Sequence, residues 1–373
     1  MEKVLHVIGN LDIGGAQSSL YNIWPALATS KIYHVEFCAL NALGRYGQLL
    51  QSEGAVVHNM GFKERISLEM INRLHQLVDR NNYSIVHVHL FPELYLAPLA
   101  IHSLQREIPL IYTEHSANNR RRKILFPFWF LDKLAYSRYK KIVAVGNSTF
   151  ENLRIWQPGL SPKMVRIPNS VRRPKSLDKN IARMKILSEL GLSQPNNKLL
   201  ILFAGRLTYP KGCDLLIEAL SRQELPDYLC LIAGDGPDKP ALINMVNHKE
   251  LGDKIRFLGF RSDVNFLLSG VDLLVVPSRW EGLPMIVLEA MAAQCPIVAS
   301  AVDGTKELVQ DCISAILVPP MNPDLLSQAI RKMLVDPQLR NEFAKQSSLK
   351  VENYSPHIVA SKLFEIYDYV LEK

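Results

Sequence analysis

Two glutamates beside a helix start are the residues of this chain best suited to chemistry. Seven residues separate Glu281 from Glu289. The apolar run 271–277 predicts a buried strand, and Pro284 suits the first turn of the helix that follows. A helix start offers free N–H groups to a diphosphate, and a carboxylate there could accept hydrogen bonds from sugar hydroxyls. A buried helix with two incidental charges is the alternative explanation for this segment alone.

A second set of candidates is basic. Arg206 and Lys211 are five residues apart in the loop after a predicted strand at 199–204. Two cations there could neutralise a leaving diphosphate without a metal ion, although an exposed basic loop explains them as well. Because no Asp-x-Asp motif follows a predicted strand, we expect no catalytic metal ion and no cofactor besides a co-substrate.

Glycine turns follow two of the predicted strands. Gly14 and Gly15 follow the first strand, where glycine permits close approach of the backbone to a ligand. The tight turn at Gly234 could receive a flat ring or a phosphate in the same way. Ordinary turns explain each of these glycines nearly as well, so neither turn identifies a ligand by itself.

Among the histidines on or after predicted strands, three are considered for the site. His115 follows a strand and could hydrogen-bond a sugar hydroxyl or accept and donate a proton. His87 and His89 alternate along one strand and therefore point the same way. We expect these two to be structural.

The elements that must position these residues alternate between strand and helix. In the first half the apolar pattern predicts strands at 4–8, 33–40, 55–58, 85–89, 110–113, 141–145 and 165–167. After a polar, proline-bearing segment at 169–176, strands are predicted at 199–204, 229–233, 255–257, 273–276, 296–299 and 315–318. This pattern predicts an α/β protein with two doubly wound, Rossmann-like domains facing a central cleft. We place the domains at 1–172 and 173–355, with a last helix at 356–373 packing back on the first domain.

Composition excludes several classes of protein. The 373 residues are 48% hydrophobic and 21% charged, which is ordinary for a globular protein. The first apolar run is too short for a signal peptide, and no apolar run approaches the length of a membrane span. Five scattered cysteines without C-x-x-C spacing indicate free thiols in a reducing cytoplasm rather than a zinc site.

The net charge of +7 is unevenly distributed. Residues 120–141 combine a basic run with an aromatic run, as proteins do that contact an anionic membrane surface peripherally. A solvated basic loop leading into a core helix is an equal alternative. Nucleic-acid binding is not expected, because no recognised binding motif accompanies the charge.

Taken in order, these motifs resemble family four of the retaining glycosyltransferases, whose members have the GT-B fold. The resemblance extends from residue 8 to about 319. It rests on Gly14-Gly15, Thr113-x-His115, Val145-Gly146-Asn147-Ser148, Gly205-Arg206-x4-Lys211-Gly212, the turn at 233–237, Phe257-Leu258-Gly259 and the segment 281–292. Two departures occur, Asn169-Ser170 where the family has Asn-Gly and Asp303-Gly304 where it has Gly-Gly.

The resemblance implies a role for each candidate residue. Arg206 and Lys211 would hold the donor diphosphate and stabilise it as leaving group. Glu281 would bind the transferred sugar, and Glu289 the ribose hydroxyls. The remaining donor contacts would come from the backbone of Gly14 and Gly15, from the helix start at Gly282, Leu283, Pro284 and Met285, and from Gly234 and Arg256 around the base. His115 would contact the sugar or the acceptor.

The function that the resemblance implies is retaining transfer of a hexose or N-acetylhexosamine from a nucleotide diphosphate sugar to a glycan acceptor. The departing phosphate would take the acceptor proton after attack on the same face. The segment 113–120 is similar to bacterial enzymes of surface polysaccharide biosynthesis, which implies a lipid-linked acceptor and a cytoplasmic location at the inner face of the plasma membrane. An epimerase of nucleotide sugars on the same fold and a non-catalytic sugar-nucleotide-binding protein are the alternatives.

Overall fold

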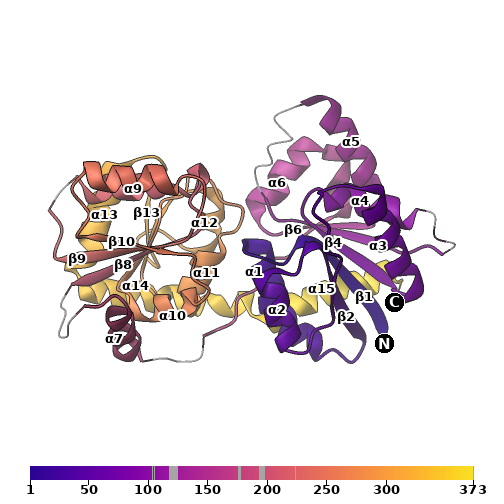
Figure 1. Ribbon diagram of the computed structural model, residues 1–373, viewed down its shortest axis with the longest axis horizontal. Coiled ribbons are helices and arrows are strands. Elements are labelled where there is room, and N and C mark those ends of the chain that lie inside the picture. Colours follow the sequence, from indigo (N-terminus) through magenta and orange to yellow (C-terminus); the bar gives the residue numbers. More distant parts are fainter. Residues whose placement is uncertain are drawn as a thin grey trace. The chain divides into compact units, whose positions relative to one another are not determined.

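The chain forms two compact units, each built around one parallel sheet (Figure 1). The computed structural model describes residues 1–372 except 103, 105, 117–124, 175–177, 193–197 and 223. Unit 1 comprises Met1–Val171 and Tyr354–Lys373, and unit 2 comprises Arg172–Asn353. The predicted α/β class, with two doubly wound sheets, is confirmed.

Unit 1 contains a seven-stranded sheet in the order β3-β2-β1-β4-β5-β6-β7. Its strands are β1 (Glu2–Asn10), β2 (Tyr33–Ala42), β3 (Val57–Asn59), β4 (Ile85–His89), β5 (Leu110–Glu114), β6 (Lys141–Ala144) and β7 (Met164–Arg166). Its helices are α1 (Gly15–Ala28), α2 (Gly44–Ser52), α3 (Leu68–Arg80), α4 (Glu93–Ile101), α5 (Leu125–Ser137), α6 (Asn147–Trp156), the 3-10 helix η2 (Pro158–Lys163) and α15 (Pro356–Val370).

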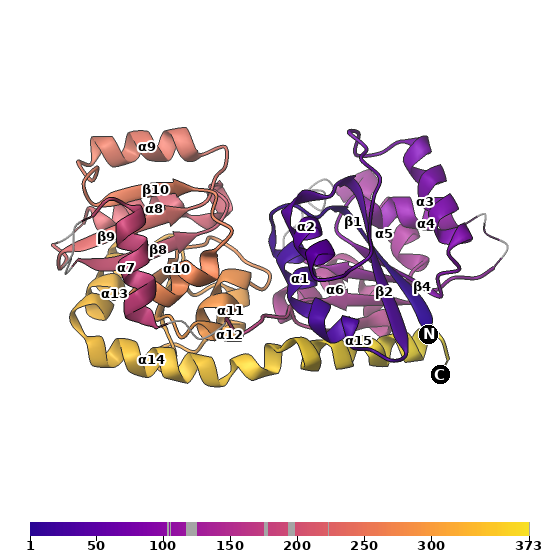
Figure 2. The ribbon, with the colours of Figure 1, turned by 60° about the horizontal axis from the view of Figure 1, so that its bottom comes forward.

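Both faces of the first sheet are buried, which is why its strands read as nearly continuous apolar runs. Alternate residues of β1 point to opposite faces, so Val4 and Ile8 pack with α1 and α15, while Leu5 and Val7 pack with α3 and α4. Helix α15 lies beside α1 although some 330 residues separate them (Figure 2). The C-terminal helix therefore completes the core of the unit that begins the chain.

Unit 2 contains a six-stranded sheet in the order β10-β9-β8-β11-β12-β13. Its strands are β8 (Leu199–Ala204), β9 (Tyr228–Ala233), β10 (Ile255–Gly259), β11 (Leu273–Val276), β12 (Ile297–Ser300) and β13 (Ile316–Val318). Its helices are α7 (Lys179–Glu189), η3 (Tyr209–Lys211), α8 (Cys213–Leu220), α9 (Lys239–His248), α10 (Val264–Gly270), α11 (Met285–Ala292), α12 (Asp303–Leu308), α13 (Pro323–Val335) and α14 (Pro337–Leu349), and η4 (Val351–Tyr354) leads back to unit 1.

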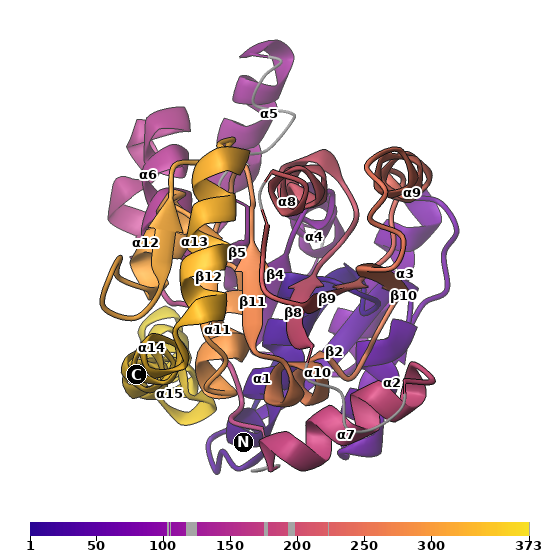
Figure 3. The same cartoon turned by 90° about the vertical axis from the view of Figure 1, so that its left-hand side faces the viewer.

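The second sheet is also covered on both faces (Figure 3). Helices α8, α9 and α13 cover one face through a core that includes Leu216, Leu242 and Ile330. Helices α7, α10 and α11 cover the other. Every predicted strand of both halves is present in the structure, with ends that differ from the prediction by at most two residues.

Composition led to two expectations, one about the cysteines and one about membrane-spanning helices. All five cysteines are free, and four of them are buried. No helix in the described part of the chain has the length and apolar character needed to cross a bilayer. The basic run 120–123 lies outside the described residues.

Candidate functional site

The point where the strand order of the second sheet reverses carries three of the predicted site residues. Strand β8 lies between β9 and β11, so the loops that leave β8 and β11 diverge at the carboxyl edge of the sheet. Ligands of doubly wound sheets bind at this switch point. The loop after β8, here called the cation loop (residues 205–212), carries Arg206 and Lys211; the loop after β11, the glutamate loop (residues 277–284), carries Glu281.

Lys211 and Glu281 are in direct contact. The Lys211 Nζ donates to both carboxylate oxygens of Glu281, at 2.7 and 2.9 Å. Ser278 Oγ donates to Glu281 Oε1 at 2.7 Å. The Glu281 side chain is only 9% exposed and that of Lys211 is 33% exposed, so the pair is screened less than a surface ion pair. The structure therefore brings together a cation and a carboxylate that are 70 residues apart in the sequence.

Arg279 holds the two loops against each other. Its guanidinium donates to both carboxylate oxygens of Asp214, at 2.8 and 2.6 Å, and to the Tyr209 carbonyl at 2.7 Å. It also lies 3.9 Å from the centre of the Tyr209 ring, and its backbone N–H donates to the Pro210 carbonyl at 2.8 Å. The hydrogen bonds that Arg279 donates to Asp214 raise the pKa of Arg279 above its usual range. Lys211, the next residue after Pro210, is thereby positioned opposite Glu281.

The helix start behind Glu281 is formed as the sequence predicts. Helix α11 begins at Met285, with Pro284 at the N-cap. Val287 and Leu288 donate to the Pro284 carbonyl, at 3.1 and 3.4 Å, so the N–H groups at the helix start that have no acceptor within the helix are those of Met285 and Ile286. Glu289 follows in the second turn and is half-buried. Gly282 and Leu283 join Glu281 to this helix.

A close backbone contact supports the glutamate loop from a third strand. A side chain on Gly304, after β12, would place its Cβ 2.4 Å from the Gly282 carbonyl oxygen. Only glycine permits this approach. Asp303, which departs from the family pattern, is exposed at the start of α12, so the departure leaves the packed glycine in place.

The turn at Gly234 lies at the same edge of the sheet. The Gly234 N–H donates to the Gly259 carbonyl at 2.7 Å, and a Cβ on Gly234 would lie 1.9 Å from the Gly205 carbonyl oxygen. The backbones that end β8, β9 and β10 are therefore packed against one another. Arg206 extends from the same region, is exposed, and forms no ion pair with any residue in the described part of the chain.

Arg256 points to the opposite end of its strand. Its guanidinium donates to the carbonyl groups of Gly252 and Ile255, which lie at the amino end of β10. The structure thus does not bring this side chain to the carboxyl edge that holds Lys211 and Glu281. At that edge β10 contributes Gly259 instead.

Three predicted residues belong to unit 1. Gly14 is the N-cap of α1 and Gly15 begins that helix, directly after the first strand and its loop. His115 follows β5, and its Nε2 lies 3.2 Å from His89 Nδ1. Burial lowers the pKa of His115 to about 4, and a hydrogen bond to the Asn169 side chain opposes part of that shift.

Sequence reasoning missed Ser278, Arg279 and Asp214. Ser278 is three residues from Glu281, so a polar residue next to a candidate carboxylate was the available signal. Arg279 and Asp214 are 65 residues apart, and nothing in the local pattern pairs them.

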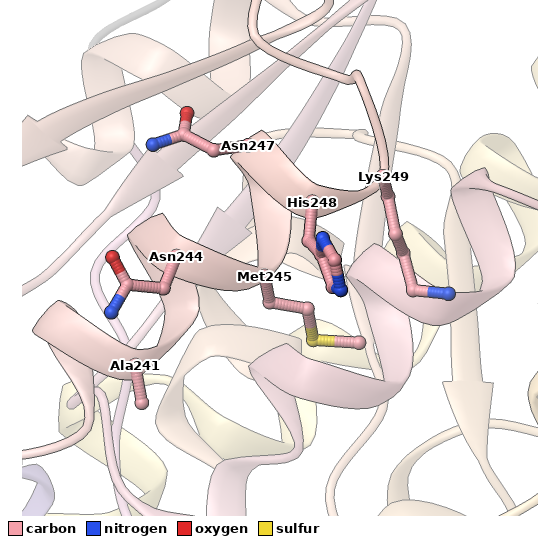
Figure 4. A pocket seen from close by; sticks show the side chains of 6 residues that line it. All are labelled: Ala241, Asn244, Met245, Asn247, His248 and Lys249. Carbon is pink, nitrogen blue, oxygen red and sulfur yellow. The ribbon is translucent and has the colours of Figure 1, made fainter.

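A surface hollow on α9 is distinct from this site (Figure 4). It is lined by Ala241, Asn244, Met245, Asn247, His248 and Lys249, none of which is a predicted site residue. Lys249 is paired with Glu218 of α8 at 2.7 Å. The hollow lies outside the carboxyl edge of the sheet, where the polar groups converge.

Two family models match the chain. Residues 13–173 match the model described as Glycosyltransferase Family 4, and residues 191–349 match that described as Glycosyl transferases group 1. Together with the two doubly wound sheets and the Lys211–Glu281 pair, these matches show that the chain belongs to the family 4 glycosyltransferases and has the GT-B fold.

Individual relatives agree with this family. The alpha-D-kanosaminyltransferase of Streptomyces kanamyceticus is 31% identical over 198 residues, which cover 52% of this chain and 50% of that protein. The chain thus spans about half the length of this relative. The UDP-Gal:alpha-D-GlcNAc-diphosphoundecaprenol alpha-1,3-galactosyltransferase of Escherichia coli is 26% identical over 293 residues, covering 75% of this chain and 73% of that protein.

Solved structures show the same fold over the full chain. The Anabaena protein HepE, crystallised with UDP and glucose, has a TM-score of 0.84 at 20% identity and covers 99% of this chain and 100% of its own. Sucrose-phosphate synthase from Thermosynechococcus elongatus has a TM-score of 0.82 at 19% identity, with full coverage of both chains.

Proposed function

We propose that this chain is a retaining glycosyltransferase that moves a hexose or N-acetylhexosamine from a nucleotide diphosphate sugar to a glycan acceptor. The observation that carries the proposal is the Lys211–Glu281 pair at the switch point of the second sheet. A donor of this class combines a diphosphate with a sugar, and the pair offers one group of the right charge to each.

The cations of the cation loop suit a leaving diphosphate. An ammonium group has three N–H donors, so Lys211 can keep its contact with Glu281 and still donate to a phosphate oxygen. Arg206 is exposed and can form a bidentate contact with a second phosphate oxygen pair. Because these two side chains supply the positive charge, we expect transfer to proceed without a divalent metal ion.

The glutamates suit hydroxyl groups of the donor. Ser278 and Lys211 fix the Glu281 carboxylate, so its remaining lone pairs can accept hydrogen bonds from the transferred sugar. Glu289 is on the same local element, where it would hold the ribose hydroxyls. Two carboxylates on one element do not flank a glycosidic bond as a glycosidase pair does, so we assign the acceptor proton to the departing phosphate.

The names of the relatives support a lipid-linked acceptor. The Escherichia coli relative is named for UDP-galactose and a diphosphoundecaprenol acceptor, and HepE was crystallised with UDP and glucose. We therefore propose surface polysaccharide synthesis at the cytoplasmic face of a membrane, with a uridine diphosphate sugar as the first donor to test.

The test is a donor and acceptor screen. Calorimetric titration with uridine, guanosine and adenosine diphosphate sugars should find one that binds, and its sugar should then appear on a lipid-linked glycan only when that acceptor is present. The anomeric configuration of the product should equal that of the donor, as measured by NMR. Interconversion of the free nucleotide sugar without acceptor would identify an epimerase instead, and binding without transfer to any acceptor would identify a binding protein.

Variants of the pair test the site. Glu281→Gln and Lys211→Ala should each lower kcat/KM by about 100-fold or more, because each removes a charged group from the donor site. The matched control is Glu342→Gln on the exposed face of α14, which should leave kcat/KM unchanged. Normal turnover by the Glu281→Gln/Lys211→Ala double variant would contradict the assignment.

The exposed face of α5 supports peripheral contact with an anionic membrane. Trp129, Phe130, Leu131 and Leu134 are 39 to 57% exposed on this helix. Lys133 lies 5.3 Å from the centre of the Trp129 ring. Apolar side chains beside basic ones match the boundary between acyl chains and anionic headgroups.

Vesicle pelleting tests this contact. The Phe130→Ser/Leu134→Ser variant should pellet less than the natural protein with vesicles that contain anionic lipid, and replacing residues 120–123 with Ser or Gln should act in the same direction. Leu349→Ser, which changes an exposed leucine of α14, should pellet like the natural protein. Equal pelleting of all four proteins would rule out this surface.

A further inference from the structure

A series of hydrogen-bonded polar side chains, here called the histidine network, crosses one face of the first sheet and ends at His115. Its members come from β1, β4, β5 and α15, and all but His115 are at most 5% exposed. In the order of their hydrogen bonds, the members of the histidine network are Thr113, His87, Tyr367, His6, His89 and His115.

Strand register explains why these residues meet. In the parallel pairing of β1 with β4, His6 is opposite His87, and in that of β4 with β5, His89 is opposite Thr113. All four side chains point to the face covered by α1 and α15. Helix α15 belongs to the other end of the sequence (Figure 1). It adds Tyr367, whose hydroxyl contacts His6 and His87.

Each histidine between the two ends uses both ring nitrogens. The successive contacts are Thr113 Oγ1 to His87 Nε2 at 2.7 Å, His87 Nδ1 to the Tyr367 hydroxyl at 3.0 Å, that hydroxyl to His6 Nε2 at 3.0 Å, His6 Nδ1 to His89 Nε2 at 2.9 Å, and His89 Nδ1 to His115 Nε2 at 3.2 Å. The nitrogen that takes no part in these contacts is His115 Nδ1; the Asn169 side chain also interacts with this ring.

The four rings are neutral in this environment. Burial lowers the pKa of His6 to about 3 and that of His115 to about 4, and it lowers the pKa values of His87 and His89 well below their usual range. A neutral imidazole has one N–H donor and one lone pair. Each contact needs one donor and one acceptor. When the buried Tyr367 hydroxyl donates to one of its two imidazole partners and accepts from the other, the direction of the first hydrogen bond determines the direction of all the others.

Two arrangements of the protons satisfy every contact and also use the Tyr367 O–H. A third, in which the Tyr367 oxygen accepts from both His87 and His6, would leave this buried O–H without an acceptor in the described part of the protein and is therefore disfavoured. In the first of the two, the Thr113 hydroxyl donates to His87, every ring carries its proton on Nδ1, and His115 presents Nδ1–H. In the second, every proton is on Nε2, the Thr113 hydroxyl accepts from His87, and His115 presents a lone pair. The second arrangement leaves the buried Thr113 O–H without an acceptor in the described part of the chain. Burying a donor without an acceptor costs the full free energy of removing it from water, which favours the first arrangement.

We propose that the histidine network, from Thr113 through Tyr367 to His89, holds His115 in the Nδ1–H tautomer, so that His115 acts as a hydrogen-bond donor and not as a base. The ligand atom it fits is an oxygen with a lone pair, such as that of a sugar hydroxyl. The nature of this ligand rests on the proposed function, whereas the tautomer does not. Thr113, His87, Tyr367, His6 and His89 are positioning residues.

A shared metal ion is the other use for such a cluster. His6, His87 and His89 each have a nitrogen within 4.8 Å of those of the other two. The rings of His87 and His89 are stacked, with centres 4.5 Å apart, and His6 and His89 already contact each other through their nitrogens. Stacked rings direct their in-plane lone pairs side by side rather than toward one point, which favours hydrogen bonding over coordination.

Nitrogen-15 NMR of the full chain, labelled in its ten histidines, measures the tautomers directly. Signals are assigned by single His→Gln variants. In the natural protein, His6, His87, His89 and His115 should each show the protonated nitrogen at Nδ1. Tyr367→Phe removes the hydroxyl that joins His87 to His6, so His6, His89 and His115 should shift toward mixed tautomers. Thr113→Val should reduce the Nδ1–H fraction at His87, and Thr113→Ser should restore it.

Tyr33→Phe is the matched control. The Tyr33 ring is 5.3 Å from that of Tyr367, but the Tyr33 hydroxyl donates to Asp368 and is not part of the histidine network. Its spectrum should keep all four Nδ1–H signals. Nε2–H at His89 and His115 in the natural protein, unchanged tautomers in Tyr367→Phe, or a bound metal ion found by elemental analysis would each overturn the proposal. These readouts need no donor or acceptor, so a failure of the proposed function would leave them interpretable.

Discussion

Arg279 shows how one side chain can position a site without contacting the substrate. It joins the glutamate loop to Asp214 of α8 and to the backbone beside Lys211. Its side chain is 8% exposed and that of Asp214 is 41% exposed, so water competes only at the carboxylate end of this ion pair. An arginine fork that binds both oxygens of a carboxylate restricts the relative orientation of its two elements more than a lysine would.

Arg279→Ala should therefore lower the free energy of unfolding of unit 2 by about 2 kcal/mol, the range for buried hydrogen bonds to charged groups. Urea unfolding followed by circular dichroism measures the change. The comparison is Arg73→Ala, which breaks a pair with Glu69 whose side chains are 55 and 63% exposed. An exposed pair of this spacing contributes about 0.5 kcal/mol or less. Equal losses in the two variants would show that Arg279 does not join the loops.

At the scale of elements, the glutamate loop is supported from the neighbouring strand end. The start of α12 approaches the loop so closely that Gly304 is in contact with the Gly282 carbonyl. The backbone that leads from Glu281 into α11 is therefore held on two sides, by Arg279 and by α12. Such support keeps the first turn of α11 in the position that a diphosphate would need.

Gly304→Ala tests this support. The added methyl group would lie 2.4 Å from the Gly282 oxygen, so the glutamate loop must move. We expect a loss of about 1 to 3 kcal/mol of stability, as for overpacked sites, and weaker binding of the donor. Gly252→Ala adds the same methyl group where no atom lies within 4 Å and should change neither quantity. Calorimetric unfolding and donor titration of both variants provide the measurements.

At the scale of the whole molecule, the two units differ in their buried ionisable groups. Unit 1 holds four neutral histidines in the network around Tyr367, and three of them, His6, His87 and His89, are buried. Residues 172–353 of unit 2 contain one histidine, His248, which is exposed on α9. Burying a titratable group in its neutral form makes stability depend on pH only below the pKa that the group has in the unfolded chain.

Unit 1 should consequently lose stability before unit 2 when the pH falls. Below about pH 6.5 the unfolded chain takes up protons at these histidines while the folded unit does not, so each contributes a loss of up to about 1.4 kcal/mol per pH unit. Above that pH the contribution is fully present. Glu36, whose pKa the contacts with Tyr83 and His58 lower to about 2 against the opposing effect of its burial, adds a loss only below about pH 4.5.

Urea unfolding at pH 7.5 and pH 5.5, followed by hydrogen-exchange labelling at one common pH and mass spectrometry, separates the two units. Peptides from β1, β4 and β5 should lose protection at a lower urea concentration at pH 5.5, while peptides from β8 and β11 should shift much less. An equal shift in both sets would contradict the assignment to the histidines.

Much of the fold follows from local patterns. All thirteen strands in the described part of the protein were predicted, because their buried apolar runs and the turn residues between them act over a few neighbouring residues. The start of α11 at Met285 follows from Pro284 and the apolar run beyond it for the same reason. The two departures from the family pattern were also visible in the sequence, but the exposure of Asp303 and the packing of Gly304 were not.

By itself the sequence determined which residues could do chemistry and that they follow strands. Only the tertiary structure decided which of them meet. Strand order brings Lys211 to Glu281 across 70 residues, and Arg256 lies at the far end of β10. Strand register places His87 and His89 in the histidine network that reaches His115. The physical reason is that turns and periodicity depend on near neighbours, whereas contacts between distant residues depend on the register and order of the strands that carry them.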